Sequence, residues 1–210
     1  MALFPRSVLS TAYFPPVEYF FAIANSGKVL VEQHDVYQKQ SYRNRCVIYS
    51  AGGPESLTVP VVKEGMHARP IRDIRIDYSE PWLQHHVRAI CSAYNSSPFF
   101  EYYADDLLPV LERRETFLFD LDMNLLSVLL DLLGMKPDLS LTEEFVHCYG
   151  EGDFRDVIQP KHKGATLLET YKNEKTYFQV FSIKSGFVPN LSVLDLLSNE
   201  GPDAGSFLRI

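Results

Sequence analysis

Two acidic side chains and a histidine follow one of the expected strands closely. Glu32 belongs to the end of the β-forming run at residues 28–33, and His34 and Asp35 come next. In open α/β sheets, ligands bind beyond the carboxyl ends of the strands. A histidine beside carboxylates can act as a general base. We therefore expect Glu32 and His34 to be catalytic, and the alternative is an exposed loop histidine.

A second polar group precedes an expected β-hairpin and consists of Lys39, Arg43, Asn44 and Arg45. A guanidinium group matches the geometry of a carboxylate or phosphate, and an asparagine can orient a hydroxyl or amide group. These four residues are therefore predicted to bind a small anionic ligand, such as a sugar nucleotide or a carboxylate. The alternative is a solvated basic turn.

A third group lies on the expected helix at residues 79–96. Trp82, His86 and Tyr94 are spaced by four and eight residues, so they share roughly one face of that helix. His86 is the second histidine predicted to be catalytic, and Tyr94 is predicted to bind substrate. A histidine packed against a tryptophan for structural reasons is the alternative.

The elements that must position these groups begin with a strand–helix–strand unit. Residues 7–11 and 28–33 read as strands, and residues 17–24 read as a short helix that ends at Asn25-Ser26-Gly27. This order within about 30 residues is compatible with a parallel βαβ unit.

The rest of the chain mixes strands and helices. Turn residues Ala51-Gly52-Gly53-Pro54 join two β-rich runs into a hairpin. The further expected elements are strands at 45–50, 55–61, 71–78 and 177–183, helices at 79–96, 105–112, 116–133 and 193–198, and an exposed excursion at 157–175. We expect one α/β domain over residues 1–210 with a mixed sheet and a helical middle section; α+β is the alternative fold class.

The helix at 116–133 carries leucines at three- and four-residue spacing, which is typical of a helix that packs one face into a core. A face that binds a partner or a second copy of the chain is the alternative. An oligomer therefore remains possible.

Composition excludes several classes of function. The net charge of −7 argues against nucleic-acid binding, which needs a basic surplus. Three scattered cysteines form neither a disulfide framework nor a zinc motif, the histidines have no metal spacing, and phosphate-loop signatures are missing. We expect no metal and no membrane span, and the cofactor stays undetermined. Because the first ten residues lack a secretory apolar region, we expect a cytoplasmic protein.

Several segments, taken in order, resemble the WbqC-like protein family. The likeness spans nearly the whole chain, and the order and spacing of its motifs are fairly specific. The motifs are Ala12-Tyr13-Phe14-Pro15-Pro16-Val17-Glu18-Tyr19-Phe20, Tyr42-Arg43-Asn44-Arg45, Pro81-Trp82 with His86 and Tyr94, Pro98-Phe99-Phe100-Glu101-Tyr102-Tyr103, Asp153-Phe154-Arg155, Pro160-Lys161, and Gly186-Phe187-Val188-Pro189-Asn190-Leu191-Ser192-Val193-Leu194-Asp195-Leu196-Leu197.

The resemblance implies a role in bacterial surface-polysaccharide assembly and a transferase that acts on sugars. It adds Tyr13 of the first motif to the residues expected to bind substrate. Many relatives have His-Gln-Pro before this Tyr-Phe-Pro, where this chain has Ser10-Thr11-Ala12. If that histidine were catalytic, the present chain would have lost it or would use His34 in its place.

Three readings follow. The leading one is a transferase that adds an acyl or aminoacyl group to a nucleotide-linked amino sugar. The second is a non-catalytic ligand-binding or scaffold protein of the same pathway, which predicts binding without turnover. The third is a structural partner that assembles through the leucine face and predicts a stable oligomer.

Overall fold

A three-stranded parallel sheet begins the fold in the computed structural model, which describes residues 2–172 and 176–210. β1 (Phe4–Ser10) is followed by α1 (Val17–Ala24) and β2 (Ser26–Glu32). β1 and the short β5 (Leu139–Leu141) flank β2 on its two sides, and both pair with it in parallel. The expected parallel βαβ unit is therefore confirmed, while β5 was not predicted.

A loop segment extends this sheet on the free edge of β1. The amide of Val8 donates to the carbonyl of Gly152 at 2.8 Å, and the amide of Phe154 donates to the carbonyl of Val8 at 2.9 Å. Gly152 has a φ of +85°, and a Cβ there would lie 2.0 Å from the carbonyl oxygen of Arg6. Only glycine allows this close approach. The segment thus runs parallel to β1 and delivers the residues after it to the carboxyl ends of the strands.

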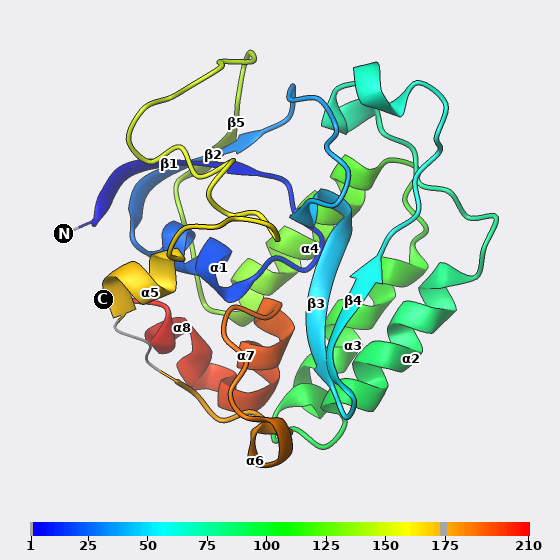
Figure 1. Cartoon of the computed structure of the whole chain (residues 1–210), viewed down its shortest axis with the longest axis vertical. Helices are drawn as coiled ribbons and strands as arrows, with labels where there is room; N and C mark the ends of the chain where they lie inside the picture. Colours follow the sequence, from blue (N-terminus) through cyan, green and yellow to red (C-terminus); the bar gives the residue numbers. More distant parts are fainter. Residues whose placement is uncertain (1, 173–175) are drawn as a thin grey trace.

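The antiparallel hairpin is confirmed and forms a separate two-stranded sheet. β3 (Arg45–Ser50) pairs with β4 (Gly53–Thr58). Figure 1 shows the hairpin between the parallel sheet and the helices α2 (Trp82–Tyr94) and α3 (Phe100–Glu112). The remaining helices are α4 (Leu118–Leu132), α5 (Leu167–Lys172), α6 (Ser182–Ser185), α7 (Val193–Glu200) and α8 (Ala204–Phe207).

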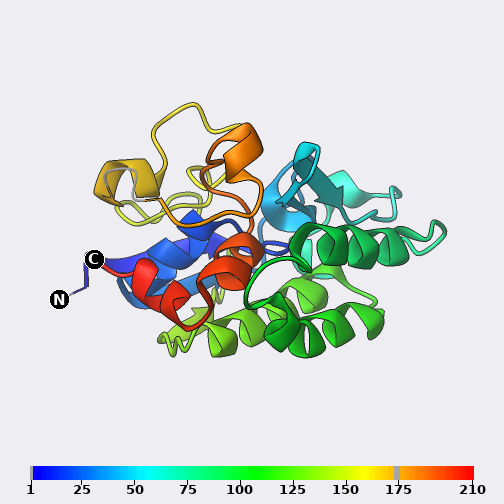
Figure 2. The ribbon, with the colours of Figure 1, turned by 90° about the horizontal axis from the view of Figure 1, so that it is seen from below.

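The hydrophobic core lies on both sides of α1. Residues 17–23 of this helix are all buried, which explains why its sequence lacks a polar stripe. In Figure 2, α1 and the first strands lie between the segment that contains α5 and the helix α4. Leu121, Leu125 and Leu129 of α4 are at most 1 % exposed. The leucine face is therefore part of this core, as expected, and is not a free docking surface.

Two predicted strands are not strands. Residues 71–78 contain a 3-10 turn at Ile71–Asp73 and only isolated bridges afterwards. The buried residues Ile71, Ile74 and Ile76 are three and then two positions apart, so the spacing is not the regular alternation of a strand. At 177–183, Tyr177 and Gln179 are buried alternately, but this segment pairs with no strand in the part of the chain that the structure describes.

A side chain replaces strand pairing in that second segment. The amide group of Gln179 donates to the carbonyl of Val188 at 2.9 Å and accepts from the amide of Val188 at 2.9 Å. These two hydrogen bonds have the arrangement of a pair in a β-ladder, but one partner is a side chain. The segment therefore has the alternating burial of a strand without belonging to a sheet.

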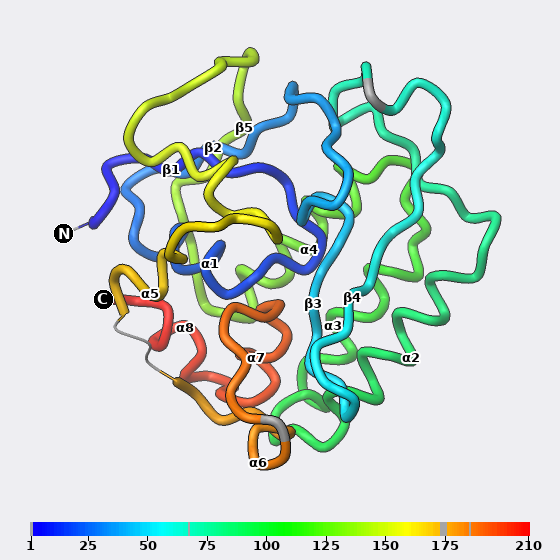
Figure 3. Tube along the Cα trace, in the orientation of Figure 1, coloured from blue at the N-terminus to red at the C-terminus, as the bar shows by residue number. Residues whose placement is uncertain are grey.

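The expected excursion at 157–175 is only partly exposed. It contains α5, and its residues Ile158 and Leu167 are buried in the core; residues 173–175 of the excursion lie outside the described part. Figure 3 traces this segment back across the end of β1 before α5. Among the described residues, no helix is long and apolar enough to cross a membrane.

Candidate functional site

Polar residues gather where the parallel strands end. β1 ends at Ser10 and is followed by Thr11, β2 ends at Glu32, and β5 is followed by Thr142. Arg155 comes directly after the segment that pairs with β1. Because parallel strands place their carboxyl ends at one edge, residues far apart in the sequence meet there.

Glu32 is the centre of a buried hydrogen-bond network at this edge. Its side chain is fully buried, and its Oε2 forms an ion pair with Arg155 Nη1 at 3.3 Å. Its Oε1 accepts hydrogen bonds from the backbone N–H of His34 at 2.7 Å and from the hydroxyl of Thr142 at 3.0 Å. These three donors fix the orientation of the Glu32 carboxyl group.

Arg155 is held on several sides. Its Nε and Nη2 donate to the two carboxylate oxygens of Asp153, at 2.9 and 2.7 Å. The hydrogen bonds with Asp153 raise the pKa of Arg155, and partial burial opposes them. The rings of Phe145 and Tyr149 lie 5.7 and 5.1 Å from the guanidinium carbon. The guanidinium is thus a fixed positive charge next to Glu32.

His34 is oriented by its contact with the end of β5. Its Nε2 lies 3.1 Å from the carbonyl oxygen of Thr142. A carbonyl oxygen only accepts hydrogen bonds, so Nε2 carries the hydrogen and Nδ1 of neutral His34 keeps a free lone pair. Nδ1 is therefore the atom through which His34 can accept a proton.

Arg43 lies inside the protein beside this edge. Its Nη2 forms an ion pair with Asp35 Oδ2 at 2.5 Å, and its Nη1 donates to the side-chain oxygen of Gln38 at 3.3 Å. The side chain of Arg43 is 2 % exposed, whereas that of Asp35 is 17 % exposed. Burial lowers the pKa of Arg43, and the charge of Asp35 counteracts this effect.

An open cavity of about 130 Å³, which we call the edge cavity, adjoins these ion pairs. It is lined by Asp35, Gln38, Phe145, His147, Arg155 and Asp156. Planar polar groups and an exposed phenyl ring occur together in this lining. Such a lining can hydrogen-bond to the hydroxyl or amino groups of a ligand and can cover one apolar face of it.

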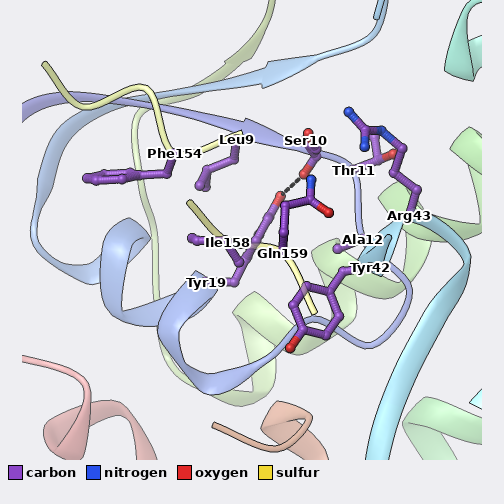
Figure 4. A pocket seen from close by; sticks show the side chains of 10 residues that line it. All are labelled: Leu9, Ser10, Thr11, Ala12, Tyr19, Tyr42, Arg43, Phe154, Ile158 and Gln159. Carbon is purple, nitrogen blue, oxygen red and sulfur yellow. Dashed lines mark hydrogen bonds between the residues drawn. The ribbon is translucent and has the colours of Figure 1, made fainter. Parts of the chain in front are cut away.

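A smaller space lies on the other side of Arg43, and we call it the inner recess. It has room for about one water molecule, with a volume of about 10 Å³. Figure 4 shows its lining, in which the hydroxyl of Tyr19 donates to the carbonyl of Ser10 at 2.9 Å. The hydroxyl of Ser10 has no hydrogen-bond partner among the described residues.

The backbone just after the inner recess is strained. Phe14 is 1 % exposed and has a φ of +40°, a value that a bulky side chain rarely adopts. Such strain concentrates at functional sites, where surrounding structure holds it in place.

The structure brings together three of the predicted site residues, Glu32, His34 and Arg43, at this edge; Arg43 lines the inner recess, whereas Glu32 and His34 lie behind residues that line the edge cavity, next to Arg155 and Asp35. Tyr13 and His86 lie elsewhere, in the core, where the hydroxyl of Tyr13 and Nδ1 of His86 are 2.9 Å apart. His86 is 2 % exposed and packs against Trp82. Burial lowers the pKa of His86 to about 4, so this histidine is neutral at physiological pH.

Tyr94 is also buried away from the edge. Its hydroxyl accepts a hydrogen bond from the amide of Tyr49 at 3.3 Å, and it neighbours the buried carboxyl of Asp195. Tyr94, Tyr13 and His86 line neither the edge cavity nor the inner recess. Their surroundings are those of structural side chains.

The remaining predicted anion-binding residues separate from Arg43. Asn44 is 6 % exposed, and its side chain donates to the carbonyl of Val59 at 2.8 Å, which joins the two ends of the hairpin. Arg45 is half-buried at the start of β3, and Lys39 is exposed. Neither contributes to the lining of the edge cavity or of the inner recess.

Sequence reasoning missed Arg155 and Thr142 as site residues. Arg155 is part of a family motif, but nothing in the sequence indicates that its segment returns to β1. Thr142 follows a strand too short to recognise. Among the described residues, no group of three or more acidic, histidine or cysteine side chains could hold a metal ion.

The fold and the edge site define an α/β protein with a polar site at the carboxyl ends of a parallel sheet. The chain belongs to the WbqC-like protein family, whose model matches residues 11–167. It is 27 % identical to the uncharacterized protein Rv1507c of Mycobacterium tuberculosis, over 97 % of this chain and 96 % of that protein. No solved structure matches it significantly.

Proposed function

We propose that this WbqC-like protein is a cytoplasmic transferase that modifies a nucleotide-linked amino sugar in bacterial surface-polysaccharide synthesis. The observation that carries the proposal is the edge cavity, where Asp35, Gln38 and Arg155 meet beyond the ends of the strands. Acidic and amide side chains suit the hydroxyl and amino groups of a sugar, and the guanidinium suits its anionic groups.

The proposed roles follow from the contacts. His34 accepts a proton at Nδ1 from the attacking amine or hydroxyl of the acceptor, because its Nε2 is turned to Thr142. Glu32 fixes the backbone at His34 and holds Arg155 in place. Arg43 supplies positive charge beside the cavity. The activated amine or hydroxyl attacks the carbonyl carbon of an acyl or aminoacyl donor, and the leaving group of the donor departs with the electron pair of the broken acyl bond.

The proposal is tested by incubating the protein with a UDP-linked amino sugar and either an acyl-CoA or an aminoacyl donor. Mass spectrometry then detects an acylated sugar nucleotide. His34→Gln should abolish product formation but keep binding, because the residues of the cavity are unchanged. His86→Gln is the matched control, since His86 lies in the core, and it should retain turnover wherever it folds. Binding without turnover by the wild type would favour the scaffold reading.

A further inference from the structure

Two polar side chains of the edge cavity are held from behind by one residue, Arg43. Its Nη2 contacts Oδ2 of Asp35 at 2.5 Å, and its Nη1 donates to Oε1 of Gln38 at 3.3 Å. The side chain of Arg43 is 2 % exposed and does not line the edge cavity, whereas Asp35 and Gln38 both line it. A single buried guanidinium therefore fixes two side chains of the cavity wall.

These contacts decide which atoms a ligand meets at Asp35 and Gln38. An arginine only donates hydrogen bonds, so the atom of the Gln38 amide that faces Arg43 is the oxygen, and Nε2 remains as a donor. Oδ1 of Asp35 remains as an acceptor, and neither atom has a hydrogen-bond partner among the described residues. A sugar hydroxyl both donates and accepts, so two neighbouring hydroxyls match this donor and this acceptor.

Acceptors outnumber donors in the lining, because Asp156 adds a second carboxylate to that of Asp35. A ligand for this cavity must therefore bring several N–H or O–H groups. A uracil base linked to ribose carries a single N–H group, whereas a pyranose carries hydroxyl or amino groups around its whole rim. The lining thus favours the sugar part of a nucleotide-linked sugar over its base.

Phe145 supplies the apolar part of the lining. It is 49 % exposed, which is unusual for a large hydrophobic side chain that lines a cavity of polar residues. The guanidinium carbon of Arg155 lies 5.7 Å from the centre of its ring, and the ring of His147 meets it edge-on at 6.5 Å. The face of an aromatic ring is negative, so it attracts the C–H groups that cover one side of a pyranose.

We propose that the edge cavity holds the pyranose ring of the substrate and that Phe145 is the specificity-determining residue, with the C–H face of the sugar against its ring. Two neighbouring polar groups of the sugar bond to Oδ1 of Asp35 and to Nε2 of Gln38. Arg43 is a positioning residue, because it orients both of these side chains without touching the sugar. The inference deepens the proposed function and rests on it for the class of the ligand.

Saturation-transfer NMR on the full chain tests this contact with the methyl glycoside of N-acetylglucosamine, a neutral probe that needs neither a nucleotide nor a donor. In the wild type, the C–H protons of one face of the sugar ring should receive the strongest transfer. Phe145→Ala should weaken binding at least about fivefold, because the aromatic face and its apolar area are removed. Phe145→Trp keeps an aromatic face and should bind about as well as the wild type. No transfer to the sugar in the wild type, or equal binding by Phe145→Ala, would overturn the proposal.

Phe178→Ala is the matched control for the loss of an exposed phenyl ring. Phe178 is 52 % exposed and does not line the edge cavity, so its substitution should leave binding of the glycoside unchanged. A loss as large as that of Phe145→Ala would contradict a specific contact with Phe145.

Gln38→Glu tests the hydrogen-bonding pattern separately from the ring. Glutamate keeps an oxygen for Arg43 but places a second acceptor where Nε2 donates, so a sugar hydroxyl loses its donor. Binding should fall at least about fivefold, because a buried polar group is then left without its partner. Gln84→Glu adds the same charge at an exposed position outside the cavity and should have no effect. Unchanged binding by Gln38→Glu would contradict the proposed pattern.

Uridine is the competing probe, because its base could also stack on Phe145. An excess of uridine should leave the sugar signals of the wild type unchanged, whereas displacement of the glycoside would place the base in the cavity and overturn the proposal. The proposed function fails in a different way. Sugar binding that depends on Phe145, without any acylated product, would refute the transferase and leave this inference intact.

Discussion

The ion pair between Arg155 and Glu32 joins the loop beside β1 to the end of β2, and Arg155→Met tests how much the site depends on it. Methionine keeps much of the apolar stem of arginine but removes the charge and all the donors. Glu32 would retain its hydrogen bonds from His34 and Thr142 but would lose its counter-ion.

The magnitude follows from burial. The Glu32 side chain is fully buried and that of Arg155 is 7 % exposed, so solvent screens the pair little. Removing one partner of a buried pair leaves an uncompensated charge and costs about 3–5 kcal/mol. We expect Arg155→Met to lower the free energy of unfolding by this amount at pH 7. Adding Glu32→Gln should restore at least about 1 kcal/mol, because the unpaired charge is then removed.

Urea denaturation at pH 7 measures both effects. Arg6→Met is the matched control, because Arg6 also lies over the ring of Tyr149, at 5.3 Å, but has no carboxylate partner among the described residues. It should cost less than about 1 kcal/mol. A loss below about 1 kcal/mol for Arg155→Met, or a double variant no more stable than Arg155→Met alone, would refute the account of the network.

Two further predictions concern buried titratable groups away from the edge. Burial raises the pKa of Asp195 from 3.8 to about 6, so its contribution to stability is lost as the pH rises from about 4 to 6. Asp195→Asn should therefore stabilise the fold by up to about 3 kcal/mol at pH 7 and by little at pH 4, as measured by urea denaturation; an equal effect at both pH values would contradict this. His86 has a lowered pKa, so its contribution is present above pH 6.5 and is lost towards pH 4. The wild type should lose about 3 kcal/mol more over that interval than His86→Gln, as measured by urea denaturation; an equal loss in both proteins would contradict this.

The elements that follow local sequence patterns could be predicted. α1 begins and ends where its turn residues indicate, and α4 shows the three- and four-residue spacing of a core helix. The hairpin is predicted by the turn residues Ala51-Gly52-Gly53-Pro54. In contrast, β5 is only three residues long, and its extended conformation depends on pairing with β2. The local sequence of β5 therefore does not predict it.

The candidate site was predictable in two places, at the end of a recognisable strand and in the basic group before the hairpin, which contains Arg43. Glu32 and His34 were found because they end β2, and the edge of a parallel sheet is a general location for ligands. The pairing of the segment at 152–154 with β1, which brings Arg155 to the same edge, depends on a long-range approach that Gly152 permits. Helical spacing placed His86 correctly beside Trp82 but could not reveal that the space around it is closed.

The most direct test of the central claim is a thermal-shift panel of sugar nucleotides, amino acids, ATP and acyl-CoA. It compares the wild type with Gln38→Ala and Asp156→Ala, two exposed residues of the edge cavity, and with Lys39→Ala as a control outside it. A ligand at 100 times its dissociation constant stabilises the fold by about 2.7 kcal/mol, which raises the melting temperature by about 5–10 °C. We predict this rise with a UDP-linked amino sugar for the wild type and Lys39→Ala, and its loss in both cavity variants. An equal rise in all four proteins, or none with any sugar nucleotide, would contradict the assignment of the site.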